Sequence, residues 1–207
     1  MTDSKKVLEI IKVMAEIIHE NAQFLTDLDA PIGDNDHGIN MDRGFQKVLS
    51  DLPGVEKDDI GAILKKTGMD LVSTVGGSSG PLYGTAFMKA GAAVAGKYEI
   101  NADDFVAIME AAVGGVQLRG KAEKGEKTML DAMIPATEAI KKGVSEGKSA
   151  SAFLADGVTA AKEGVEYTKT IIATKGRASY VGERSIGHQD PGATSFTLLL
   201  ESIAALY

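Results

Sequence analysis

The sequence predicts an all-α fold of eight helices, and three observations support this prediction. Aromatic residues make up only 5% of the chain and tryptophan is absent, while alanine, leucine and methionine are common, which favours helices over a β-sandwich. Apolar residues recur at helical spacing, and no segment reads as a convincing strand. Polar, glycine-bearing segments separate the apolar stretches. We expect a single domain over residues 1–207, because this length suits one core and no linker or repeat divides it.

The first half of the chain contains four predicted helices. In the first, the apolar side chains fall on one stripe, as in a helix with one buried face. Pro53 and Gly54 end the second, and Asp58 or Asp59 is a suitable N-cap for the third. The fourth is rich in small residues. The four helices cover about residues 7–25, 40–49, 59–74 and 82–95.

The second half contains four more. Thr128 with Asp131 resembles a capping box in which Asp replaces the usual Glu. Asp190 and Pro191 are a favourable N-cap and first-turn pair for the last helix. These four helices cover about residues 102–118, 129–142, 150–173 and 191–204.

Among the connections between predicted helices, four carry most of the glycines and polar side chains. They follow the first, third, fifth and seventh predicted helices, at residues 26–38, 76–81, 120–127 and 175–190. If successive helices alternate up and down, these four connections lie at the same end of the molecule. The alternation therefore predicts that scattered polar segments form one site.

Composition excludes several classes of function. The net charge is -7 and no basic block appears, which argues against a nucleic-acid surface. The absence of cysteine rules out disulfides and thiolate metal sites. No apolar run reaches the ~18–20 residues that a membrane span needs. The N-terminal segment mixes charged with apolar residues, unlike a signal peptide, so we expect a cytoplasmic protein.

The first polar connection contains three aspartates that are candidate metal ligands, Asp29, Asp34 and Asp36. Clustered carboxylates repel one another unless a cation neutralises them, and oxygen ligands suit Mg²⁺ or Ca²⁺. An EF-hand is excluded, because the twelfth position counted from Asp34 is Phe45 rather than Glu. Mg²⁺ usually combines few carboxylates with substrate phosphates, so the loop favours a nucleotide diphosphate and phosphoryl transfer. A solvated loop stabilised by Asx-turns is the alternative.

The other polar connections offer groups for phosphate. Residues 76–80 read Gly-Gly-Ser-Ser-Gly, which allows close backbone approach and places two hydroxyls before a helix. The segment 115–122 resembles a Walker A motif, but Ala122 stands where Ser or Thr must bind Mg²⁺, and a helix precedes it instead of a strand. Arg177 and Arg184 can neutralise phosphate, or simply stabilise their own loop. For His37, phosphate contact, base chemistry and a plain loop position all remain open.

Four long motifs in order resemble the dihydroxyacetone kinase L subunit (DhaL) family, a module that also forms the C-terminal domain of ATP-dependent dihydroxyacetone kinases. They read GDNDHGINMDRG at 33–44, GGSSGPLYG at 76–84, RGKAEKGEKTMLD at 119–131 and GRASYVGERSIGHQDPGATS at 176–195. The resemblance covers almost the whole chain. One departure is Asn35, where many relatives have Gly.

The resemblance implies an eight-helix antiparallel up-and-down barrel with ADP or ATP bound at one end. It implies two Mg²⁺ ions held by Asp29, Asp34 and Asp36. It also implies nucleotide contacts from His37, Gly38, Ile39, Asn40, Ser78, Ser79, Gly120, Met129, Arg177, Asp190 and Gly192. No residue of this chain would form a covalent intermediate, because catalysis would rest on positioning and charge neutralisation.

A free-standing L module resembles the version of the family that depends on the phosphoenolpyruvate phosphotransferase system. There, the phosphohistidine of DhaM rephosphorylates bound ADP, and the γ-phosphoryl passes to dihydroxyacetone on DhaK. Two alternatives are a separately encoded L module of an ATP-dependent kinase and a nucleotide-dependent regulatory partner of a transcription factor. Nucleotide exchange distinguishes the first two, since the phosphotransferase version needs tightly held ADP and the ATP-dependent version needs exchangeable ATP.

Overall fold

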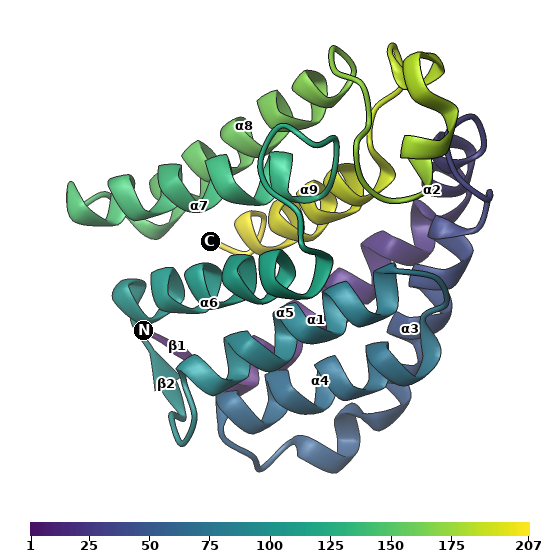
Figure 1. Cartoon of the computed structure of the whole chain (residues 1–207). Helices are drawn as coiled ribbons and strands as arrows, with labels where there is room; N and C mark the ends of the chain where they lie inside the picture. Colours follow the sequence, from purple (N-terminus) through teal and green to yellow (C-terminus); the bar gives the residue numbers. More distant parts are fainter.

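The computed structural model describes all residues 1–207 and is all-α apart from one pair of two-residue strands (Figure 1). The α-helices are α1 (Ser4–Glu20), α2 (Ala22–Asp29), α3 (His37–Asp51), α4 (Ile60–Thr74), α5 (Ser79–Ala93), α6 (Ala102–Gly120), α7 (Leu130–Ser145), α8 (Ala150–Thr168) and α9 (Pro191–Ala204). The 3-10 helices are η1 (Leu52–Val55) and η2 (Arg177–Ser185), and the antiparallel strands are β1 (Thr2–Asp3) and β2 (Glu99–Ile100). The predicted all-α class is confirmed, whereas closure into an eight-helix barrel stays a prediction.

Five helices begin at a side chain that accepts a hydrogen bond from a backbone N–H of the first turn, which satisfies one of the otherwise unpaired donors there. These N-caps are Asp3, Asp59, Asn101, Ser149 and Asp190. The predicted caps at Asp59 and Asp190 are therefore confirmed. Thr128 is not the N-cap of α7, which follows Met129 instead. Asp131 nevertheless accepts from the Thr128 backbone N–H at 2.8 Å, so half of the expected box forms.

Two predicted helices differ most from the structure, one through a local contact and the other through a tertiary one. The first predicted helix is divided at Asn21, whose side-chain amide donates to the Ile17 carbonyl at 2.8 Å and so competes with continuation of the helix. The predicted helix 150–173 ends early, at Thr168. The Thr168 carbonyl accepts a hydrogen bond from the Lys127 ammonium group, which belongs to another segment of the chain. The sequence predicts a loop without helix at residues 175–190, whereas the structure has η2 there.

Close helix packing builds the core, a single cluster of 42 buried apolar residues. Neighbouring helices in the chain pack against each other, most extensively α4 with α5, α5 with α6 and α7 with α8 (Figure 1). Glycines allow the backbones of α4 and α5 to meet. A Cβ at Gly68 would lie 2.6 Å from the Gly84 carbonyl oxygen, and one at Gly91 would lie 2.5 Å from that of Gly61. Apolar side chains also enclose most of a cavity of about 320 Å³ among the helices.

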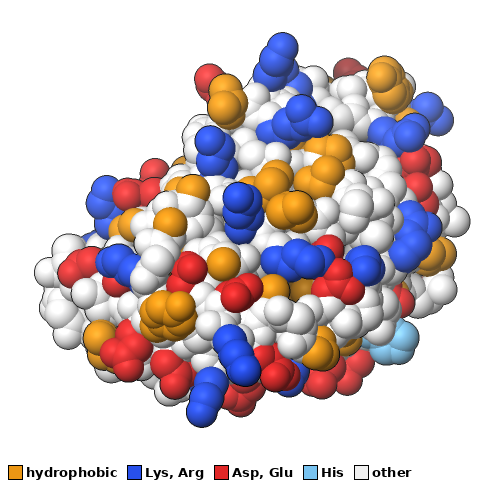
Figure 2. Space-filling view, turned by 90° about the horizontal axis from the view of Figure 1, so that it is seen from below, with side chains coloured by type: hydrophobic (Ala, Val, Ile, Leu, Met, Phe, Trp, Pro, Cys, Tyr) orange, Lys and Arg blue, Asp and Glu red, His pale blue; other side chains and the backbone are white.

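The surface is of mixed charge. Figure 2 shows one face on which Lys and Arg side chains lie next to Asp and Glu, with smaller hydrophobic groups between them. No helix combines the length and the apolar character that crossing a bilayer requires.

Candidate functional site

A cavity of about 490 Å³ lies where the four polar connections meet. All four contribute to its wall, which confirms that alternation of the helices brings them to one end. The predicted site residues that line the cavity are Asp29, Asp34, Asp36, His37, Ser78, Ser79, Gly120, Met129, Arg177, Asp190 and Gly192. Charged and polar side chains contribute much more to this lining than to that of the apolar cavity in the core.

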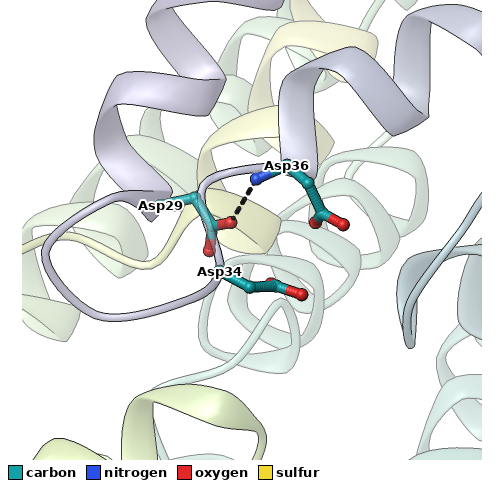
Figure 3. Close-up of side chains that lie close together, drawn as sticks. All are labelled: Asp29, Asp34 and Asp36. Carbon is teal, nitrogen blue, oxygen red and sulfur yellow. Dashed lines mark hydrogen bonds between the residues drawn. The ribbon is translucent and has the colours of Figure 1, made fainter.

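The three aspartates lie close together, with Asp29 at the end of α2 and Asp34 and Asp36 on the loop between α2 and α3 (Figure 3). One carboxylate oxygen from each falls within 4.8 Å of the others. Backbone N–H groups of Asp36 and His37 donate to Asp29 Oδ2 at 3.0 and 3.3 Å, which fixes that carboxylate. Gly33 is required beside it, because an added Cβ would lie 1.9 Å from Asp29 Oδ1. The loop thus presents three oxygen donors at a spacing suited to a hard cation.

Electrostatics agree with a cation at this position. Partial burial is the main effect that raises the pKa of Asp34 above its ordinary value, and the Asp36 carboxylate adds to it. The Arg177 guanidinium acts in the opposite direction. Arg177 Nε contacts Asp34 Oδ2 at 2.9 Å. One arginine does not compensate three carboxylates, so the donor set and its charge both fit a divalent cation. Asn35 supports the turn with a φ of 61°, a left-handed conformation that Asn tolerates better than most residues.

His37 begins α3 and is buried between two hydroxyl groups. Its Nδ1 lies 3.0 Å from Ser79 Oγ, and its Nε2 lies 2.9 Å from Ser195 Oγ. Burial lowers the pKa of His37 to about 4, against the raising effect of the Asp29 and Asp36 carboxylates. The imidazole is therefore neutral at physiological pH. Its burial between partners also makes it unsuitable as an exposed phosphoryl carrier.

The second polar connection leads into the N-terminus of α5. Gly77 has a φ of +65°, which glycine adopts without strain. The chain then enters α5 at Ser79, with Ser78 immediately before it, and both serines line the cavity. The unpaired N–H groups of a helix N-terminus favour an anion, and the two hydroxyls add further donors.

Apolar residues in and near the third and fourth connections line another part of the cavity. Met129 lies next to Gly192, where an added Cβ would be 3.4 Å from Met129 Cβ. Leu82, Val116 and Ala122 extend this apolar part of the lining. Such a surface suits a flat, uncharged group, whereas the aspartates and serines suit charged phosphates.

Three of the predicted contact residues do not line the cavity, because α3 begins earlier than expected and carries them away from it. Gly38 packs against α2, where an added Cβ would lie 1.8 Å from the Ala22 carbonyl oxygen. The Ile39 side chain is 55% exposed. Asn40 is buried and accepts from the Arg43 guanidinium at 2.6 Å. Nucleotide contact by these three residues stays a prediction.

Lys127 is not among the residues expected at the site, but it is 1% exposed and lines the cavity. Its ammonium group donates to the carbonyls of Thr168 and His188, so it joins the third connection to the end of α8 and to the fourth connection. Burial lowers its pKa, and the Asp190 and Asp131 carboxylates oppose that effect. No sequence signal distinguishes this lysine from Lys121 or Lys124 in the same loop.

Asp190 provides a test of these electrostatics through pH. Its carboxyl group faces the cavity but is surrounded by protein, and burial raises its pKa from 3.8 to about 7. The folded chain therefore binds this proton more tightly than the unfolded chain does, so the contribution of Asp190 to stability falls as pH rises from about 4 to about 7. In Asp190→Asn that fall should disappear, while the amide oxygen still caps α9 by accepting from the Ala193 N–H. Urea unfolding of both metal-free proteins across this range measures the difference, and parallel stability curves would contradict the assignment.

Known proteins are similar to this chain over most of its length. The DAK2 domain model matches residues 31–205. The chain is 44% identical over 189 residues to a protein of Escherichia coli described as PEP-dependent dihydroxyacetone kinase, ADP-binding subunit DhaL, covering 91% of this chain and 90% of that one. It is 42% identical over 194 residues to the Lactococcus lactis PTS-dependent dihydroxyacetone kinase, ADP-binding subunit DhaL, with 91% and 90% covered.

A solved structure shares the fold. The dihydroxyacetone kinase of C. freundii, in complex with AMP-PNP and Mg²⁺, superposes with a TM-score of 0.74 at 23% identity. The match covers 97% of this chain and 34% of that kinase, so the present chain corresponds to about a third of it. The family model spans most of the sequence and the two relatives are matched over nearly their full lengths. This chain therefore belongs to the DAK2 domain family.

Proposed function

We propose that this protein is the ADP-binding subunit of a phosphoenolpyruvate-dependent dihydroxyacetone kinase. The observation that carries the proposal is the meeting of three aspartates, the Ser78–Ser79 helix start and Arg177 in one cavity. It is supported by 44% identity, over nearly the whole of both chains, to a subunit described as ADP-binding.

The phosphate end of the nucleotide is assigned to the acidic loop and α5. Asp29, Asp34 and Asp36 are proposed to hold two Mg²⁺ ions, which when bound neutralise the charge of the phosphates. Asp29 is already oriented by two backbone N–H groups, so little reorganisation is needed there. Arg177, paired with Asp34 at 2.9 Å, lies where its guanidinium group can turn to a phosphate oxygen.

The base is assigned to the apolar wall. Met129 and its neighbours offer an adaptable surface to an adenine ring, and Gly120 and Gly192 leave room for close approach. This assignment places the sugar and phosphates between Met129 and the aspartates, across a cavity of about 490 Å³.

The reaction is proposed to need two partners. A DhaM-type protein supplies a phosphoryl group from its own phosphohistidine to bound ADP, and a DhaK-type protein presents dihydroxyacetone to the resulting γ-phosphoryl. This chain contributes position and charge, with no covalent intermediate of its own. His37, at 7% exposed and bonded at both nitrogens, is consistent with that passive role.

The test is retention of nucleotide. Native mass spectrometry of the protein after gel filtration and desalting is expected to show one ADP with Mg²⁺ per chain, and reconstitution with DhaK, DhaM and phosphoenolpyruvate to give turnover without added free ATP. Rapid loss of nucleotide, with turnover on ATP and DhaK alone, would instead support an ATP-dependent kinase. Tightly bound nucleotide with no turnover in the complete mixture would support the regulatory role.

A further inference from the structure

A chain of hydrogen-bonding side chains leads from the cavity into the core. Beginning at the cavity, Ser79 Oγ is 3.0 Å from His37 Nδ1, and His37 Nε2 is 2.9 Å from Ser195 Oγ. Ser195 Oγ is in turn 2.7 Å from the Tyr83 hydroxyl. The chain joins α3, α5 and α9, and its inner members are buried, with Ser195 0% and Tyr83 3% exposed.

A neutral imidazole has one nitrogen that donates and one that accepts, so the direction of one hydrogen bond fixes the other. If His37 Nε2–H donates to Ser195, then Nδ1 accepts the only hydroxyl proton of Ser79. If Nδ1–H donates to Ser79, then Nε2 accepts the proton of Ser195, and the Ser79 proton is free to turn to the cavity. A phosphate oxygen accepts hydrogen bonds, so only the second arrangement lets Ser79 donate to it.

Ser195 has a competing acceptor in the Gly192 carbonyl, at 3.1 Å. The Tyr83 hydroxyl also reaches that carbonyl, at 3.3 Å. Only one of the two hydroxyls donates across the 2.7 Å contact, so when Tyr83 donates to Ser195 Oγ, the Ser195 proton is directed away from Tyr83 and can go to His37 Nε2. No buried side-chain nitrogen or oxygen in the structure lacks a hydrogen-bond partner.

We propose that Ser195 and Tyr83 are positioning residues, which act through His37 to turn the Ser79 hydroxyl toward a phosphate of the bound nucleotide. The inference rests on the proposed function, because it needs ADP in the cavity. It adds two residues of the core, neither of them among the expected nucleotide contacts, to the determinants of phosphate binding.

Histidine tautomers provide the direct test. The chain has three histidines, so long-range ¹H–¹⁵N correlation spectra are simple, and Asn substitution of His37 identifies its signals. With Mg²⁺ and ADP bound, His37 is expected to be the Nδ1–H tautomer. The Nε2–H tautomer in the complex would overturn the proposal.

Binding measurements provide the second test. Ser195→Ala and Tyr83→Phe should each weaken ADP binding in the presence of Mg²⁺, by about 10-fold for Ser195→Ala, the scale of one lost hydrogen bond to a charged group. In a Ser79→Ala background, Ser195→Ala should have no further effect, since the hydroxyl that it orients is gone. The matched control is Ser202→Ala, which removes a buried hydroxyl from the same helix, bonded to the Leu199 carbonyl at 2.7 Å, and should leave binding unchanged.

The outcomes separate this inference from the proposed function. An equal loss of affinity on Ser195→Ala with and without Ser79 would show a general structural effect and overturn the positioning role, and so would unchanged affinity in a folded Ser195→Ala protein. In both of these outcomes the wild-type protein still binds ADP, so the proposed function is unaffected. If the wild-type protein binds no ADP, the proposed function fails, and this inference fails with it.

Discussion

Asp36→Asn is expected to weaken Mg²⁺-dependent ADP binding by at least about 100-fold, since even residues that only support metal ligands typically account for 10- to 100-fold in affinity. The side chain makes no capping bond to α3, so helix structure should persist. In metal-free protein the change should leave the melting temperature unchanged or raise it, because it removes one of three mutually repelling carboxylates. Calorimetric titration with ADP, with and without Mg²⁺, measures the loss of affinity.

The control for this substitution is Asp42→Asn, on α3 shortly after the acidic loop, where the carboxylate lies 3.1 Å from His19 Nδ1 and outside the cavity. It makes the same change of charge and should leave ADP affinity within about two-fold, since a surface contact of this kind contributes little. Stoichiometric ADP retained by Asp36→Asn would refute the assignment of this carboxylate as a metal ligand.

Lys127→Met is expected to lower the free energy of unfolding by about 2–4 kcal/mol, because it leaves two backbone carbonyls without their donor and two carboxylates without a nearby positive charge. The loss should also weaken ADP binding, since Thr128 and Met129 follow directly in the chain and line the cavity. Urea unfolding of the nucleotide-free protein isolates the effect on stability from the effect on binding.

Lys124→Met is the matched control, an exposed lysine in the same loop whose loss should change stability by less than about 0.5 kcal/mol. Lys127→Arg should recover part of the stability, because it keeps the positive charge. Recovery should be incomplete, because arginine places its donors in a larger planar group. Equal stability of Lys127→Met and Lys124→Met would contradict the role of Lys127 as an internal tie between connections.

The fold class and the composite nature of the site could be predicted because their signals are local or periodic. Apolar spacing identified the helices, and the alternation of connections was enough to bring residues such as Asp34 and Arg177 to one end. The boundaries were less predictable, since a tertiary contact decides them. The end of α8 at Thr168 depends on Lys127, which lies 41 residues earlier in the chain.

The inner members of the site could not be predicted for the same reason. Ser195 and Tyr83 read as ordinary residues of α9 and α5, and only the packing of the two helices brings their hydroxyls within 2.7 Å. Gly38 and Ile39 show the opposite case. A resemblance in sequence groups them with the nucleotide contacts, but neither lines the cavity in the structure, so their contact with nucleotide stays a prediction.

The hydrogen bond between His37 and Ser195 joins positions 158 residues apart. During synthesis on the ribosome, the acidic loop emerges long before its partner on α9, which lies 158 residues later in the chain. A nascent chain therefore has the carboxylates long before it has the enclosing wall. We expect nucleotide capture to occur only after α9 has emerged and packed, as a late step that then stabilises the folded molecule as a whole.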